Sequence, residues 1–236
     1  EPENTLENMS AAARLTWQTD QTDFAVSYHY GWETLPTITD FPVKNIRFSG
    51  DPDTDPTQLL SNALFTDGRV QAEFKRQQRL GFEWETVLDP VGFRGEIAHI
   101  DHVSFLSDDL TSQRRPVTHL VSGIDYTSAT EWYVNLQGSW HHIHDYTRNI
   151  LYFEDNTVSL LGEISKPVWR GNLKLALQYQ YTLTDQSSYL RPYVIIKYFR
   201  HFEGEVGANI FSGDGETLLG SFDPNDQVYV RARLSF

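Results

Sequence analysis

The sequence predicts an all-β fold and, within that class, a transmembrane antiparallel β-barrel. Four observations favour it. Apolar and polar residues alternate with a period of two in many short segments. Charges stand on the polar face of these segments, whereas aromatic residues gather near the ends of the apolar face, and the connectors alternate between short and long. Such alternation turns one face of each strand toward lipid and the other toward a lumen.

Composition narrows the class of protein further. The 236 residues carry a net charge of −13, include no Cys, and are 14% aromatic. The aromatic content argues against disorder, and no apolar run reaches the roughly 18 residues that a spanning helix needs. The absence of Cys excludes a disulfide scaffold, a Cys-ligated metal and a Cys nucleophile. The negative charge disfavours nucleic-acid binding, which requires a basic face.

About eleven segments show the strand pattern. The clearest is the last, where Val228, Val230, Ala232, Leu234 and Phe236 share one face and Arg231 and Arg233 lie on the other. In chain order the candidate strands lie around residues 13–17, 24–32, 80–84, 93–97, 120–126, 132–140, 158–164, 173–183, 194–198, 206–210 and 226–236. One helical segment is a candidate, at 57–64 within a loop.

The connectors sort into two groups. Short ones lie at 18–22, 88–92, 128–131, 166–172 and 201–205. Longer ones lie at 33–68, 107–116, 145–156 and 211–226, with 184–188 the least distinct. Short turns at one rim and long loops at the other are typical of outer-membrane barrels. We therefore expect residues 1–236 to form a single barrel domain, with 33–68 and 211–226 as long outer loops.

The strand count leaves two interpretations open. Bacterial single-chain barrels usually have an even number of strands, and eleven is odd. Either one strand has been missed, or residues 1–236 are the C-terminal part of a larger barrel and the domain is incomplete at its N-terminus.

A family resemblance favours the second interpretation. The final alternating strand, with Val230, Leu234 and a terminal Phe236, resembles the C-terminal signal that the barrel-assembly machinery recognises. The segments 211–236, 78–99 and 23–36 resemble the C-terminal half of a proteobacterial, porin-like outer-membrane family of unknown function. The resemblance implies a longer barrel, and it weakly implies a role beside inner-membrane exporters of hydrophobic molecules.

The charges on the polar strand faces are the best candidates for functional residues. We expect ten of them to line the lumen: Arg79, Glu83, Arg94, Glu96, Asp125, Glu163, Lys174, Lys197, Arg231 and Arg233. Arg14, Glu85 and Glu205 join them by the same alternation. Because the two signs nearly balance, the set predicts weak ion selectivity or a network that closes the lumen. The alternative is a purely structural role as cross-strand pairs, such as Glu205 with Arg231 or Arg233.

Two weaker motifs suggest metal ions. In the segment 140–146, only His142 and His144 share a strand face, and such a pair could bind zinc or copper with two further ligands. A polar cluster at the outer rim is the simpler interpretation. Asp51, Asp53 and Asp55 are spaced like oxygen ligands of calcium, but the rest of a calcium-loop pattern is absent. A solvated loop that shares divalent cations with lipopolysaccharide is the simpler interpretation there.

Together these features predict a channel or export conduit for small or hydrophobic solutes in the outer membrane of a Gram-negative bacterium. No nucleophile motif accompanies the histidines, so we expect neither an enzyme nor a cofactor. The expected partners are outer-membrane lipid and lipopolysaccharide, the barrel-assembly machinery, and another chain or a periplasmic export component. Two alternatives stay open: a non-conducting structural or assembly barrel plugged by its loops or a partner, and a soluble lipocalin-like barrel.

Overall fold

The computed structural model shows an all-β protein built on one antiparallel sheet of eleven strands, which confirms the predicted strand content. It describes Thr5 and residues 8–34, 36–44, 64–65, 68–199 and 201–234. Within these ranges, no helix has the length and apolar character to cross a membrane. The candidate helical segment 57–64 lies outside the described residues except for Leu64, which belongs to a short strand.

The strands of the large sheet coincide with the eleven segments expected from alternation. They are β1 (Ala11–Gln18), β2 (Thr22–Trp32), β7 (Arg76–Leu88), β8 (Val91–Leu106), β9 (Ser112–Thr127), β10 (Tyr133–Ile143), β11 (Asn156–Val168), β12 (Leu173–Thr182), β13 (Ser188–Phe199), β14 (Phe202–Ser212) and β15 (Gln227–Leu234).

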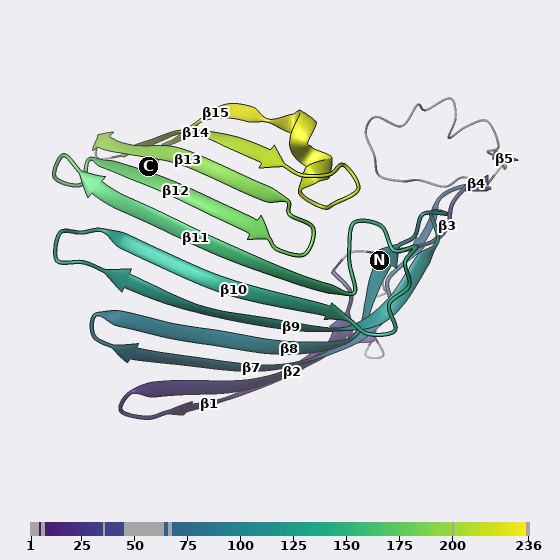
Figure 1. The fold of residues 1–236 in the computed structure, drawn as a ribbon. Coiled ribbons are helices and arrows are strands. Elements are labelled where there is room, and N and C mark those ends of the chain that lie inside the picture. Colours follow the sequence, from purple (N-terminus) through teal and green to yellow (C-terminus); the bar gives the residue numbers. More distant parts are fainter. Residues whose placement is uncertain are drawn as a thin grey trace.

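Each strand of the sheet pairs with the next one along the chain, from β1 through β2 and β7 to β15. Between β2 and β7 the chain forms two small paired elements, β3 (Thr37–Asp40) with β6 (Gln71–Glu73) and β4 (Val43–Lys44) with β5 (Leu64–Phe65). The predicted outer loop 33–68 therefore contains strands of its own. These elements project beyond the sheet (Figure 1).

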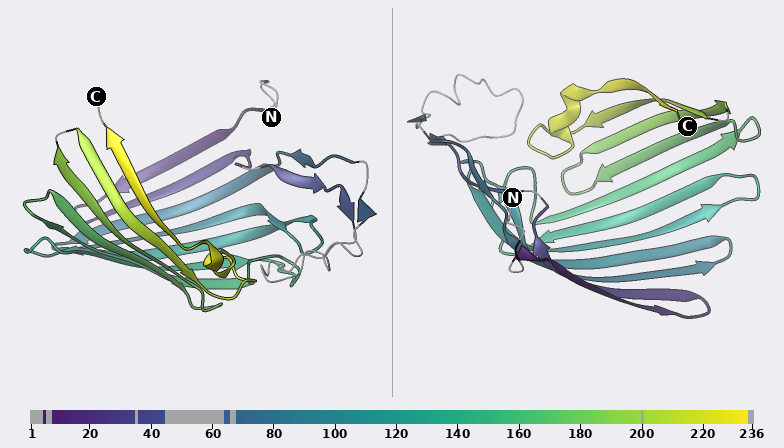
Figure 2. Two further views of the ribbon diagram at one scale, coloured as in Figure 1. Left: turned by 90° about the horizontal axis from the view of Figure 1, so that it is seen from above. Right: turned by 180° about the vertical axis from the view of Figure 1, so that it is seen from behind.

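The sheet is curved but not closed. Figure 2 shows it as a trough with β1 at one edge and β15 at the other. Among the described residues, β1 pairs only with β2, and β15 pairs only with β14. The closed barrel expected from the sequence is therefore not formed by this part of the chain.

The predicted alternation of connectors is confirmed in part. The connections β1–β2, β7–β8, β9–β10, β11–β12 and β13–β14 share one rim, and each has at most five residues (Figure 1). At the opposite rim, β2–β7, β10–β11 and β14–β15 are long, whereas β8–β9 (107–111) and β12–β13 (183–187) have five residues each. The predicted long connector 107–116 is shorter because residues 112–116 belong to β9. The connection β14–β15 contains the short 3-10 helix η2 (Gly220–Asn225). We refer to the two rims as the short-turn rim and the long-loop rim.

Strand register keeps the two predicted faces separate. Val26, Phe82 and Ile97 are paired in one row across β2, β7 and β8. The adjacent row contains Glu83 paired with Glu96. Because paired residues point to the same side of a sheet and successive residues to opposite sides, apolar rows belong to one face and charged rows to the other.

A small hydrophobic core lies at the long-loop rim. Phe105, Val117, Ile143 and Ile150 form it, and Val103, Tyr146 and Phe153 pack against it. It joins β8, β9 and β10 to the loop after β10. Most large apolar side chains of the sheet lie outside this core and are exposed, so the core does not account for the apolar content of the strands.

Candidate functional site

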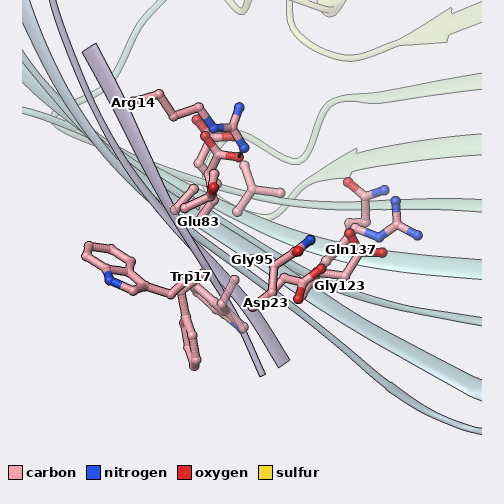
Figure 3. A pocket seen from close by; sticks show the side chains of 16 residues that line it. Arg14, Trp17, Asp23, Glu83, Gly95, Gly123 and Gln137 are labelled. Carbon is pink, nitrogen blue, oxygen red and sulfur yellow. Dashed lines mark hydrogen bonds and ion pairs between the residues drawn. The ribbon is translucent and has the colours of Figure 1, made fainter. Parts of the chain in front are cut away.

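The concave face of the sheet carries the charged rows. Figure 3 shows a pocket lined by residues of β1, β2 and β7 to β10. Arg14, Glu83 and Gln137 point toward the side on which the C-terminal strands lie, and Trp17 points to the opposite side. The register continues these rows to β15 and places all ten predicted charges on this face: Arg79, Glu83, Arg94, Glu96, Asp125, Glu163, Lys174, Lys197, Arg231 and Arg233.

Five ion pairs cross the concave face. Arg14 Nη2 lies 2.8 Å from Glu83 Oε2, Lys174 Nζ lies 2.9 Å from Glu163 Oε1, Arg191 Nη2 lies 2.6 Å from Glu205 Oε1, Lys197 Nζ lies 3.3 Å from Glu203 Oε2, and Arg94 pairs with Asp125. Four of the pairs join neighbouring strands, and the fifth, Arg14–Glu83, reaches from β1 across β2 to β7. The charges are therefore largely neutralised where they stand.

The densest part of this network centres on Arg191 of β13. Its Nη1 donates to Gln178 Oε1 at 3.1 Å and its Nε donates to Tyr229 Oη at 2.9 Å. The Tyr229 hydroxyl donates to Glu205 Oε1 at 2.6 Å, and Gln178 Nε2 donates to Glu163 Oε2 at 2.9 Å. Hydrogen bonds thus connect β11 to β15 without interruption.

Arg191 and Tyr229 were not among the residues expected from the sequence. The period of two contains the signal for Arg191, because it lies six residues before Lys197 and so shares its face. The expected pairing of Glu205 with Arg231 or Arg233 is also revised. Glu205 is opposite Arg231 in register, but its carboxylate contacts Arg191 and Tyr229.

The convex face is apolar and exposed. Among the side chains that the structure describes, large hydrophobic ones are exposed on ten of the eleven strands, β13 being the exception, and they include Leu136 at 49%, Val228 at 80% and Val230 at 77%. Trp132 directly precedes β10 and Trp140 lies three residues before its end, four residues on either side of Leu136, and Trp140 shares the convex face with Leu136. An apolar surface that spans a whole sheet is far larger than soluble monomers expose.

Two loops at the long-loop rim fold over the concave face. The loop between β10 and β11 places Ile150 and Phe153 on the concave-side residues Val117 and Ile143. Within it the Tyr146 hydroxyl donates to the Phe153 carbonyl at 3.0 Å, and burial raises the pKa of Tyr146. This loop therefore belongs to the inner surface rather than to the surrounding solvent.

The second loop is the predicted outer loop 211–226. Phe222 of η2 packs on Phe211, with ring centroids 5.6 Å apart, and Phe211 stacks on Tyr189 at 4.9 Å. Phe211 and Tyr189 are paired and belong to the concave face. A bridge between Tyr152 and Thr217 joins this loop to the loop after β10. Both loops narrow the long-loop end of the trough.

One acidic residue assigned to the outer loop is buried. Glu33 is only 8% exposed, and its carboxylate accepts hydrogen bonds from Thr37 Oγ1 at 2.7 Å, Ser104 Oγ at 3.1 Å and Arg114 Nη2 at 3.1 Å. Glu33 therefore anchors the start of the projecting strands to β8 and β9 instead of lying in solvent.

The histidines of segment 140–146 divide between the two faces as predicted. His142 and His144 share the convex face, with ring centroids 4.4 Å apart, whereas the His141 ring meets that of His119 on the concave face. His142 Nδ1 contacts Asn156 Oδ1, and His144 Nε2 contacts Thr118 Oγ1. Among the described residues, no group of three potential ligands is arranged for a metal ion.

Two other predicted sites lie partly or wholly outside the described residues. Val230 and Leu234 of the expected assembly signal lie on the convex face, and Phe236 lies outside the described residues. The calcium-like spacing of Asp51, Asp53 and Asp55 also lies outside them.

The sequence matches no protein-family model, and no curated protein matches it. Function is therefore argued from the two faces of the sheet.

Proposed function

We propose that this chain forms eleven strands in the wall of a transmembrane β-barrel of the Gram-negative outer membrane, and that the barrel acts as a channel or export conduit. In this arrangement the convex face contacts lipid and the concave face lines the lumen. The solutes are small or hydrophobic molecules, as the family resemblance in the sequence implies.

The exposed apolar face carries this proposal. Each Å² of apolar surface left in water forgoes roughly 25 cal/mol of stabilisation. The convex face exposes apolar side chains from ten strands, so a lipid environment stabilises it far more than water does. The position of Trp132 just before β10 and of Trp140 toward its other end agrees with aromatic girdles at the two membrane interfaces.

The open edges indicate what must complete the wall. Unpaired backbone groups in lipid cost several kcal/mol each, so β1 and β15 require strand partners in a membrane. Ten successive antiparallel pairings make β1 and β15 run in the same direction. An odd number of further strands between them would therefore close an antiparallel barrel with an even total, which is the usual arrangement in bacteria.

The size and charge of the lumen suggest what it conducts. Eight strands enclose a space that side chains can fill, and a wall of more than eleven leaves a water-filled interior. Its charges are of both signs and mostly paired, which favours weak ion selectivity over the strong selectivity of a single-sign ring.

The partners follow from the same arrangement. The convex face would contact outer-membrane lipid and lipopolysaccharide. Val230, Leu234 and Phe236 would form the recognition signal for the barrel-assembly machinery. The strands that close the barrel would come from another chain or from further sequence, and a periplasmic export component is the expected partner at the short-turn rim.

One observation favours a second function, a structural or assembly barrel that does not conduct. The loops that carry Phe153 and Phe222 fold over the concave face and are bridged to each other at Tyr152 and Thr217. If they close the lumen completely, the barrel scaffolds a complex instead of passing solutes.

Conductance across planar lipid bilayers separates these two functions. The full-length protein is purified in detergent and added to one side of the bilayer. We expect stable stepwise currents. Their absence at protein concentrations that insert a known porin would contradict the channel and favour the structural barrel.

A further inference from the structure

The five ion pairs leave an uneven distribution of charge on the concave face. Outside those pairs, the described N-terminal side of the trough holds three carboxylates, those of Asp23, Glu85 and Glu96 on β2, β7 and β8. It also holds one guanidinium group, that of Arg79, which lies farther from the short-turn rim and is hydrogen-bonded to Gln77. On the C-terminal edge, the guanidinium groups of Arg231 and Arg233 remain, both on β15.

Register strengthens the contrast between the two sides. Asp23 is paired directly with Glu85, and Glu83 directly with Glu96. Like charges opposite each other on neighbouring strands destabilise a sheet. Two such pairings lie side by side. Arg14 pairs with Glu83, and Arg94 of β8 is opposite Glu85, so the repulsion is partly offset. Four carboxylates against these two guanidinium groups still leave this side of the trough negative.

We call the concave side of strands β1 to β9 the N-terminal wall and that of strands β11 to β15 the C-terminal wall. A count of the charges on each wall gives the same result. We take the described concave residues from the short-turn rim up to the row of Arg79, Val117 and Ile143. Strands β1 to β9 then hold five carboxylates and three guanidinium groups: Asp23, Glu83, Glu85, Glu96 and Asp125 with Arg14, Arg79 and Arg94. Strands β11 to β15 hold three carboxylates and five cations: Glu163, Glu203 and Glu205 with Lys174, Arg191, Lys197, Arg231 and Arg233.

The N-terminal wall is thus negative and the C-terminal wall positive, with net charges of equal size. The carboxylates outside the ion pairs and the two β15 arginines lie in the short-turn half of the trough. Glu85 is near the end of β7 and Arg233 near the end of β15, both of which end at the short-turn rim. Figure 2 shows the N-terminal and C-terminal strands rising on the two sides of the trough. The space between them has a negative side and a positive side at the same level.

We propose that this lumen selects zwitterionic solutes, whose separated charges align between the carboxylate wall and the β15 arginines. The proposal rests on the proposed channel function and names its substrate class. A solute with one ammonium and one carboxylate group can approach opposite charges with both ends, whereas a simple ion is attracted by one wall and repelled by the other. A neutral solute of the same size gains nothing from either wall.

The test compares two solutes of similar size that have no net charge. Serine is the zwitterion, and erythritol is the neutral polyol. The full-length protein is reconstituted into liposomes, and the swelling rate in isosmotic serine is divided by that in erythritol. Reversing the basic edge with Arg231→Glu and Arg233→Glu makes both walls negative. We expect the serine-to-erythritol ratio to fall by about threefold, less than the tenfold or more that a single-sign cleft provides.

A second set of changes inverts the polarity instead of removing it. Glu85→Arg and Glu96→Arg alone also lower the ratio, because both walls are then positive. Combined with the two β15 changes, they produce a positive N-terminal wall and a negative C-terminal wall. The ratio then returns toward that of the unchanged protein, since a zwitterion can align in either direction.

A matched control keeps the charge of the wall constant. Arg170→Glu reverses one exposed charge in the β11–β12 turn, away from both walls, and we expect the ratio to stay unchanged. If the four-residue variant keeps a low ratio, or if the β15 variant keeps the high one, the zwitterion proposal is wrong. Absence of swelling in both solutes for the unchanged protein would instead contradict the channel function itself.

Discussion

Arg191 on β13 and Tyr229 on β15 are hydrogen-bonded to each other across the intervening strand β14, with Nε 2.9 Å from the phenolic oxygen. The contact depends on Gly207, which is paired with Tyr193 on one side and Tyr229 on the other. A Cβ at Gly207 would lie 2.7 Å from Tyr229 Oη and 2.9 Å from Tyr193 Cβ. The missing side chain therefore lets the ring of Tyr229 lie over β14.

Gly207→Ala should displace Tyr229 and weaken its bonds to Arg191 and Glu205. We expect the free energy of unfolding to fall by roughly 1–3 kcal/mol, as for other overpacked positions. Gly138→Ala is the matched control, because a Cβ there meets nothing within 4 Å. Denaturant titration in lipid vesicles measures both. Equal stabilities for the two variants would show that Gly207 does not create the space for this contact.

Glu33→Ala should loosen the attachment of the projecting strands. The change removes the acceptor shared by Thr37, Ser104 and Arg114, and charged hydrogen bonds of this kind contribute on the order of 2 kcal/mol. Hydrogen exchange at the amide of Glu33, which donates to the Lys75 carbonyl, reports the opening. Glu73→Ala, at an exposed carboxylate paired with Lys75, should leave this exchange nearly unchanged. Similar protection in both variants would argue against an anchoring role for Glu33.

Arg231→Glu with Arg233→Glu should shift the ion selectivity of the pore toward cations. The two arginines lie on the concave face outside the five ion pairs, so their reversal changes the local field directly. Reversal potentials in a salt gradient measure the shift. Arg170→Glu, in the β11–β12 turn, is a control for overall charge and should leave the potential unchanged. Unaltered selectivity in the double variant would place these residues away from the ion path.

Replacing residues 214–225 with a short Gly-Ser linker should enlarge the pore. The change removes η2 and the contact of Phe222 with Phe211, which covers the concave face at the long-loop rim. In the channel interpretation, single-channel conductance increases from an already measurable value. In the plugged-barrel interpretation, only the variant conducts. Leu218→Ala, an exposed change in the same loop, should have neither effect, and an unchanged conductance after loop removal would show that this loop does not restrict the lumen.

The period of two in the sequence was sufficient to predict most of this fold. It located all eleven strands, because each strand has one apolar and one polar face, and it placed residues as far apart as Arg79 and Arg233 on the same side. Connector length then identified the two rims. These features are local, so a single sequence contains them.

The features that depend on long-range contact were not predictable in the same way. Glu33 looks like any acidic loop residue until Arg114 and Ser104 are brought beside it. The inward folding of Phe153 and Phe222 follows no period, because loops have none. Arg191 was missed although its spacing from Lys197 fits the pattern, and its partners on β12, β14 and β15 depend on register.

Whether the sheet closes also could not be predicted from the alternation of residues. Alternation specifies which face of a strand is apolar, and it contains no information on whether the first and last strands meet. The expected barrel is an open trough in the described residues, with β1 and β15 as its edges.

The central claim, that the convex face lies in lipid, is tested most directly by adding one charge to either face of β10. Leu136 lies midway between Trp132 and Trp140 on the convex face, and Gln137 is the next residue, on the concave face. In lipid vesicles, we expect Leu136→Arg to lower the free energy of unfolding by about 2–4 kcal/mol, the cost of Arg at the bilayer midplane, and Gln137→Arg to lower it by less than about 1 kcal/mol. Equal effects of the two substitutions, or a Leu136→Arg variant as stable as the unchanged protein, would contradict a membrane-facing convex surface.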